Sequence, residues 1–105
     1  MSPTCSRSRQ KVHPLKYVLF YESADDVASK APAHYADHSA RAQEFHSRGV
    51  LLSIGVFADA QNEGAMAVFT SREAAEEFAK EDPFVINGVV RDWRVCEWME
   101  VLGAN

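Results

Sequence analysis

The sequence predicts a single α+β domain in which two helices cover one face of a four-stranded antiparallel sheet. The chain has 105 residues, a length typical of one domain. Four short segments are rich in β-branched and aromatic residues, as strands are, and two longer segments carry the apolar spacing of amphipathic helices. These segments follow one another along the chain in the order β-α-β-β-α-β.

The first strand and the first helix differ in how their apolar residues are spaced. Residues 15–22 (LKYVLFYE) are apolar on both faces, a pattern expected of a central strand that is covered on both sides. We interpret residues 23–32 as a loop and residues 33–48 as a helix that ends at Gly49, because glycine readily adopts the left-handed conformation that ends helices. One stripe of this helix is expected to be buried: Tyr35, His38, Ala42 and Phe45.

The second and third strands are predicted to form a hairpin. Residues 50–57 (VLLSIGVF) and 65–70 (AMAVFT) are apolar runs of strand length. The segment between them, residues 58–64, contains asparagine and glycine, which favour turns. We therefore expect these two strands to be neighbours in the sheet.

The second helix and the last strand complete the pattern. Ser71 is a good N-cap for a helix, and Asp82 should end that helix because a residue before proline is pushed out of the α region. Residues 83–92 are read as a loop, and residues 93–101 (WRVCEWMEV) as the last strand. The resulting order is the split βαβ arrangement of ferredoxin-like domains.

That arrangement leaves one face of the sheet uncovered, although its strands are apolar on both sides. Both helices pack on the same face, so the second face must be buried by something else or remain exposed to water. A second copy of the chain is the simplest cover, and a domain of this size gains stability from the additional burial. We therefore predict a two-fold homodimer.

Composition excludes several classes of protein. A formal net charge of −4 argues against a nucleic-acid partner, and no apolar run approaches the roughly 20 residues that a membrane-spanning helix needs. Two cysteines are too few for a disulfide framework, which favours a reducing, cytoplasmic setting. The Ser- and Arg-rich residues 1–14 are expected to form a disordered leader before a domain at 15–105; an organelle transit peptide or an over-long start are the alternatives.

Three polar side chains share one face of the first predicted helix. His34 and His38 are one turn apart, and Arg41 lies seven residues beyond His34. Imidazole titrates near neutrality, so either histidine could move a proton. The spacing also suits a metal ion, although no third ligand stands nearby in the sequence. The structural alternative is a histidine that packs against the sheet through a single hydrogen bond.

Asp82 and Gly55 also stand out. Asp82 lies at the carboxyl end of a predicted helix, where the helix dipole disfavours a negative charge, so it needs a partner such as an imidazolium or backbone donors. Its structural alternative is a turn before Pro83. Gly55 lies inside a predicted strand, where glycine costs stability and indicates a bulge or a close approach by backbone or ligand.

At these residues the chain resembles the YCII-related family of small ferredoxin-like proteins, over about residues 15–102. The matching elements are a helix histidine eleven residues before a glycine, a second glycine six residues later, a Ser-x-Glu-x-Ala helix start, an Asp-Pro-Phe-Val block with a following glycine, and a final aromatic: His38, Gly49, Gly55, Ser71, Glu73, Ala75, Asp82, Pro83, Phe84, Val85, Gly88 and Trp98. The chain departs from the family at Val56, where a proline is usual. It departs again at Cys96 and Glu97, where a basic residue is frequent.

The resemblance implies a dimeric α+β barrel and a functional pair, His38 and Asp82. In such a pair Asp82 orients the imidazole and His38 acts as general base without a cofactor. The reactions implied are isomerisation or elimination on a small aromatic or enolisable compound, such as loss of chloride from a chlorinated hydroxyquinol. His34, Arg41, Gly55 and Phe84 would contact the substrate.

Two further hypotheses stay open at this point. The chain could be a module that binds a small ligand without turnover, using the same cleft. Alternatively, His34 and His38 could hold a metal ion.

Overall fold

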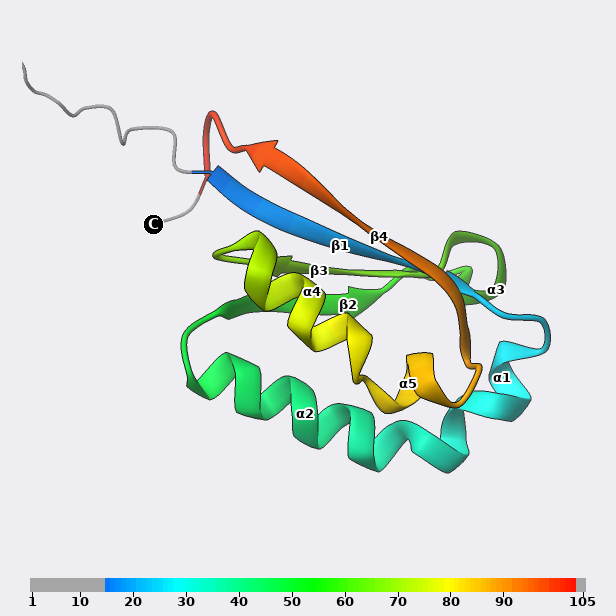
Figure 1. Ribbon diagram of the computed structural model, residues 1–105. Helices are drawn as coiled ribbons and strands as arrows, with labels where there is room; N and C mark the ends of the chain where they lie inside the picture. The colour runs from blue at the N-terminus through cyan, green and yellow to red at the C-terminus, as the bar shows by residue number, and fades with distance from the viewer. Residues whose placement is uncertain (1–14, 104–105) are drawn as a thin grey trace, which may run out of the picture.

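The computed structural model describes residues 15–103, which form a four-stranded antiparallel sheet with its long helices on one side (Figure 1). The strands are β1 (Leu15–Ser23), β2 (Leu51–Val56), β3 (Ala65–Phe69) and β4 (Val90–Met99). Their order across the sheet is β2-β3-β1-β4, so β1 is central and β4 is an edge strand. The predicted ferredoxin-like α+β fold is confirmed. The predicted leader, residues 1–14, lies outside the described residues.

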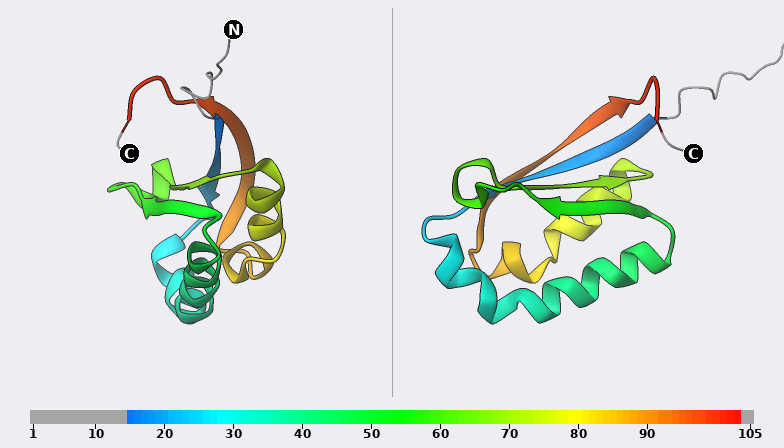
Figure 2. Two further views of the ribbon diagram at one scale, coloured as in Figure 1. Left: turned by 90° about the vertical axis from the view of Figure 1, so that its left-hand side faces the viewer. Right: turned by 180° about the vertical axis from the view of Figure 1, so that it is seen from behind.

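Two long helices and four short ones complete the domain. They are α2 (Tyr35–Ser47) and α4 (Arg72–Lys80), with the short α1 (Val27–Lys30), η2 (Ala31–His34), α3 (Ala60–Glu63) and α5 (Pro83–Ile86). Both views in Figure 2 place α2, α4 and α5 on the same side of the sheet. Within residues 15–103, no helix is long and apolar enough to cross a membrane.

Helical turns occupy three segments that the sequence predicted as loops or turns. The loop after β1 holds α1 and η2, the hairpin turn holds α3, and the segment after α4 holds α5. Aspartate caps explain the last two, because Asp59 accepts a hydrogen bond from the Asn62 N–H and Asp82 accepts one from the Phe84 N–H. Each turn has only four residues, too short to show an apolar period in the sequence.

The last strand begins earlier than predicted, at Val90 rather than at residue 93. It pairs with β1 along the whole length of that strand, from Ser23 opposite Val90 to Leu15 opposite Met99, with one irregularity beside Glu22. Pairing with the long central strand therefore sets the length of β4. It extends the strand to residues 90–92, which the sequence predicted as part of a loop.

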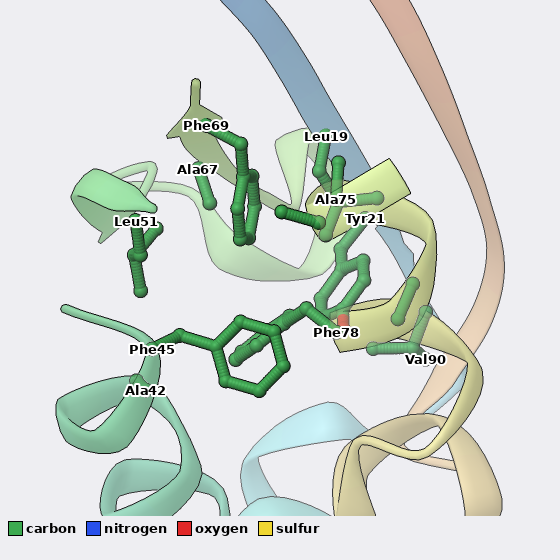
Figure 3. Close-up of a cluster of buried hydrophobic side chains, with 12 residues drawn as sticks. Leu19, Tyr21, Ala42, Phe45, Leu51, Ala67, Phe69, Ala75, Phe78 and Val90 are labelled. Atoms are coloured by element: carbon green, nitrogen blue, oxygen red, sulfur yellow. The ribbon is translucent and has the colours of Figure 1, made fainter. Parts of the chain in front are cut away.

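The hydrophobic core lies between the sheet and the helices (Figure 3). Its largest side chains are aromatic: the Phe78 ring meets the Phe45 ring edge to face at 5.2 Å between centroids and lies 5.5 Å from the Phe69 ring. Ala42 and Phe45 of the predicted helix stripe are buried, but Tyr35 is 61% exposed, so that part of the prediction is wrong. Tyr35 is the first residue of α2, beyond the reach of the core.

The opposite face of the sheet is apolar and carries no helix in the described part of the chain. Residues paired directly across antiparallel strands share a face, and the register gives two rows on this one: Gly55, Met66, Phe20 and Arg94, then Ser53, Val68, Val18 and Cys96. Figure 2 shows this face from the side without a covering element. The prediction that β1 is a central strand is confirmed, whereas the predicted cover on its second face is not part of the described chain.

Candidate functional site

A cavity of about 440 Å³ opens between the sheet and the segment that runs from α1 into α2. Its walls are mostly apolar and come from every strand and from all helical elements: Leu19, Tyr21, Ser23, Val27, Ala28, Ala31, Tyr35, His38, Ser39, Ala42, Ile54, Gly55, Val56, Ala60, Gly64, Ala65, Met66, Ala67, Phe78, Phe84, Val89 and Val90. A volume of this size suits a small organic molecule. Three residues of the predicted site therefore line the cavity: His38, Gly55 and Phe84.

Asp82 lies behind the cavity wall and is fully buried. It is placed there by its role as N-cap of α5, in which its Oδ1 accepts a hydrogen bond from the Phe84 N–H at 3.1 Å. Its carboxylate also accepts a hydrogen bond from the Tyr21 hydroxyl at 2.6 Å and one from the His38 Nδ1 at 2.9 Å. Burying a carboxylate without hydrogen-bond partners costs free energy, and these three donors offset that cost.

His38 is held in place from two directions. In the plane of its ring, Nδ1 faces both Asp82 carboxylate oxygens, at 2.9 and 3.0 Å. Across the ring, Phe84 is stacked on it with centroids 4.0 Å apart and planes 10° apart. Because a carboxylate only accepts hydrogen bonds, it fixes the proton of a neutral imidazole on Nδ1 and leaves the lone pair on Nε2.

The second ring nitrogen of His38, Nε2, is left free by the contact with Asp82. Among the described residues, Nε2 has no hydrogen-bond partner, while the side chain is 13% exposed and lines the cavity. An imidazole that becomes protonated here gains a buried counter-charge from Asp82. The arrangement can therefore take a proton from a molecule in the cavity and return it.

Tyr21 is a member of this cluster that the sequence analysis missed. It lies on the core face of β1, and Figure 3 shows its side chain reaching from the strand into the hydrophobic cluster. Burial raises the pKa of Tyr21 above its usual range, and the charge of Asp82 and the hydrogen bond to it raise that pKa further. The hydroxyl therefore stays protonated and remains a donor. The one signal in the sequence is a tyrosine on the apolar face of residues 15–21, since a buried tyrosine hydroxyl needs a partner.

The structure does not bring His34 or Arg41 to the cavity wall. Arg41 donates from Nε to the Phe78 carbonyl at 3.2 Å and from a terminal nitrogen to the Glu77 carbonyl at 2.8 Å. Its guanidinium thus caps the last turn of α4, where carbonyls lack helix partners, and lies 4.8 Å from the centre of the Phe45 ring. His34 is the last residue of η2 rather than part of α2, so the shared helix face that the sequence predicted for His34 and Arg41 does not form.

Two sequence-based hypotheses concern Gly55, as a bulge in its strand, and His34 with His38, as a metal site. The irregularity in the β2–β3 register lies between Leu51 and Ser53, so Gly55 does not form the bulge that its position suggested. A Cβ built on Gly55 would meet no atom within 4 Å. Within residues 15–103, no group of three His, Cys, Asp or Glu side chains is placed to hold a metal ion.

Comparisons with solved structures show the same fold in other proteins. The 5-chloro-2-hydroxyhydroquinone dehydrochlorinase TftG from Burkholderia phenoliruptrix AC1100, in complex with 2,5-dihydroxybenzoquinone, superposes with a TM-score of 0.64 at 16% identity, covering 79% of this chain and 92% of that one. PA3566 from Pseudomonas aeruginosa gives a TM-score of 0.51 at 11% identity, with coverages of 86% and 96%. A sequence comparison with curated proteins finds no significant match.

One further structure and the family comparison complete these findings. A mutant of MhuD, with two manganese protoporphyrin IX bound per active site, gives a TM-score of 0.50 at 20% identity and covers 88% of this chain and 99% of that one. Identities this low show the fold alone. The sequence model of the YCII-related domain, however, matches residues 15–99, nearly the whole described chain. The chain therefore belongs to the YCII-related domain family.

Proposed function

We propose that this protein is a cofactor-independent lyase or isomerase that uses His38 as general base and Asp82 as its orienting partner. The observation that carries the proposal is the direction of the imidazole, whose Nδ1 is bound to a buried carboxylate while its Nε2 has no partner among the described residues and its ring lines the cavity. A base in that position converts a bound weak acid into an anion without any further group.

The proton and electron balance is simple. Nε2 of His38 accepts a proton from an O–H or C–H bond of the substrate, and the electron pair of that bond moves into the substrate. In an isomerisation the pair shifts a double bond, and the imidazolium returns its proton to another atom. In an elimination the pair expels a leaving group as an anion, and the proton later passes to water. Dehydrochlorination, named for the structural neighbour TftG, is an elimination of this kind.

The remaining residues of the site support this step. Phe84 and Gly55 line the same cavity as His38 and are proposed to contact the substrate. Asp82 stabilises the imidazolium that forms, and Tyr21 positions Asp82 through its hydroxyl. His34 and Arg41 are left out of this assignment because neither lines the cavity.

Substitution of the two neighbouring histidines tests the proposal. Purified protein is screened by NMR for exchange of protons in D₂O and for chloride release, using enolisable ketones and chlorinated hydroquinones as substrates. His38→Ala should abolish turnover, because general-base catalysis contributes typically 10²- to 10⁴-fold. His34→Ala is the matched control, one turn earlier and outside the cavity wall, and should retain turnover. Equal loss in both variants, or full activity in His38→Ala, would overturn the assignment.

The alternative, a binding module without turnover, uses the same mostly apolar cavity. It predicts that a bound compound protects the protein against thermal unfolding in wild type and in Asp82→Asn alike, with no product formed by either. Saturable binding without turnover over the whole panel would favour this alternative. Turnover that is lost in Asp82→Asn would exclude it.

We also propose that two copies pair through the uncovered sheet face. Val18 and Val68 form its centre, and Phe20, Met66 and Trp98 surround them as partly or largely exposed apolar side chains. Phe20→Glu introduces a charge on this face and should convert a dimer into a monomer in sedimentation velocity. Tyr35→Glu, a change at an exposed aromatic residue away from this face, should leave the dimer intact. A monomeric wild-type protein would refute the pairing.

A further inference from the structure

We propose that the cavity selects uncharged ligands with a largely apolar body and discriminates against both anions and cations. This inference rests on the proposed function, because it describes the substrate class of the same site. None of the described residues that line the cavity is an Asp, Glu, Lys or Arg. A charged ligand would therefore lose its hydration without gaining an ion pair from the wall.

The polar groups of the wall are already engaged, with few exceptions. The Tyr21 hydroxyl donates to Asp82, and the Ser23 hydroxyl donates to the Ala60 carbonyl at 2.6 Å. Nε2 of His38 and the Tyr35 hydroxyl make no hydrogen bond within residues 15–103, and the Ser39 hydroxyl, which accepts a bond from Gln43 Nε2 at 3.3 Å, can still donate one to a ligand. One or two neutral polar groups on a ligand would satisfy them.

The charged groups near the cavity offer an anion no direct partner. The positive charge of Arg41 is felt at Tyr21, but its guanidinium lies outside the cavity wall and donates to the Phe78 and Glu77 carbonyls, so it offers an anion no ion pair or hydrogen bond. If His38 becomes protonated, its charge is already balanced by Asp82 at 2.9 Å, so the pair presents no net positive charge to a ligand. A cation in the cavity cannot contact the Asp82 carboxylate, because that carboxylate is fully buried and already accepts hydrogen bonds from three donors.

The mouth of the cavity carries exposed apolar side chains. Val56 is 69% exposed, Tyr35 is 61% exposed and Ile54 is 42% exposed, and all three line the cavity. Large apolar side chains left in water beside a cavity are typical of a surface that a ligand covers. The body of the ligand is therefore apolar, and its polar group points inward to His38.

This selection has a consequence for the reaction. The substrate enters as a neutral weak acid, and the negative charge appears only after His38 has taken its proton. At that moment the new anion and the imidazolium form a neutral pair with the Asp82 charge behind it. Ground-state anions are discriminated against, whereas the charge that develops during the reaction is stabilised.

Three ligands of nearly equal size and shape test the inference: benzamide, benzoate and benzamidinium. Each is titrated at neutral pH into the ¹⁵N-labelled full-length protein, and affinities are taken from the shifts of Tyr35, His38, Ile54 and Phe84. Benzamide should bind at least about tenfold more tightly than either ion, a factor worth about 1.4 kcal/mol. Tighter binding of benzoate or of benzamidinium would overturn the charge selection while leaving the His38 assignment untouched. If no ligand shifts these signals, the inference and the proposed cavity both fail.

A charge placed at the mouth provides the second test. Val56→Lys adds a cation at an exposed position of β2 that lines the cavity, and it should raise benzoate affinity at least about threefold with benzamide unchanged. Leu52→Lys is the matched control on the same strand, because Leu52 is also exposed but does not line the cavity. An equal gain in both variants would show attraction to the surface and would overturn the inference.

Discussion

The imidazole ring of His38 lies flat against the phenyl ring of Phe84, with centroids 4.0 Å apart and planes 10° apart. The same short helix that presents Phe84 also places Asp82 at its N-cap, where the carboxylate binds His38 Nδ1. The Asp-Pro-Phe block therefore holds one histidine through two different contacts. Proline between the two residues begins α5 and fixes the direction in which each side chain leaves the chain.

Loss of the stacked ring should affect turnover more than stability. Phe84→Leu keeps an apolar side chain but removes the flat surface on His38, so the imidazole gains freedom to rotate. We expect a loss of about 0.5–1.5 kcal/mol in the free energy of unfolding, measured by urea denaturation, and a fall in kcat. Phe57→Leu, at an exposed phenylalanine outside the cavity wall, should change neither quantity. Unchanged kcat in Phe84→Leu would count against a role for the stack.

Removal of the buried carboxylate should be among the most destabilising changes in the protein. Asp82→Ala leaves the Tyr21 hydroxyl, the His38 Nδ1 and the Phe84 N–H without their acceptor. We expect a loss of about 3–5 kcal/mol in the free energy of unfolding. Asp59→Ala, at the exposed N-cap of α3, is the matched control and should cost about 1 kcal/mol. Similar losses in the two variants would show that Asp82 acts as a cap and nothing more.

The buried hydroxyl of Tyr21 should make the protein lose stability at alkaline pH. Its pKa is raised in the folded protein, whereas an unfolded tyrosine releases its proton near about pH 10. The unfolded state therefore binds fewer protons above that pH, and the free energy of unfolding falls by about 1.4 kcal/mol per pH unit for this one group. The contribution is fully present below about pH 10 and is lost as pH rises beyond it.

Two phenylalanine variants check this pH dependence. Tyr21→Phe should flatten the alkaline slope of the free energy of unfolding by the amount of one proton, measured by urea denaturation at a series of pH values. Tyr35→Phe removes an exposed hydroxyl and should retain the wild-type slope. If Tyr21→Phe and wild type fall in parallel, the alkaline loss arises elsewhere.

Arg41 should act on stability and not on ligand contact. Its guanidinium bonds two carbonyls at the end of α4 and packs over Phe45, a geometry that the ammonium of lysine cannot copy. Arg41→Lys should therefore lower the free energy of unfolding by about 1–2 kcal/mol, while benzamide affinity stays within about twofold of wild type. A selective loss of ligand binding with normal stability would restore the substrate-contacting role that the sequence suggested.

Local patterns in the sequence were sufficient for the order of elements, whereas the family resemblance, and no local pattern, paired His38 with Asp82. Residues 15–22 predicted a central strand with two apolar faces, because the assignment of side chains to faces by period-two spacing is a local property of the chain. Asp82 stood out because an acid at a helix end needs a partner, which is also a local argument. The short helices α3 and α5 were not predicted, because a segment of four residues is too short to show a helical period in its apolar residues.

The tertiary structure alone decided which residues meet at the cavity. Tyr21 and Asp82 are 61 positions apart, and only the packing of α5 beside β4 and α2 brings the hydroxyl to the carboxylate at 2.6 Å. The sequence placed His34, His38 and Arg41 on one helix face, yet His34 ends the short η2 and the guanidinium of Arg41 bonds the carbonyls of α4, so that only His38 reaches the cavity wall. Periodicity fixes the direction of a side chain relative to its own element. The partner that it meets there is set by long-range packing, which no local spacing contains.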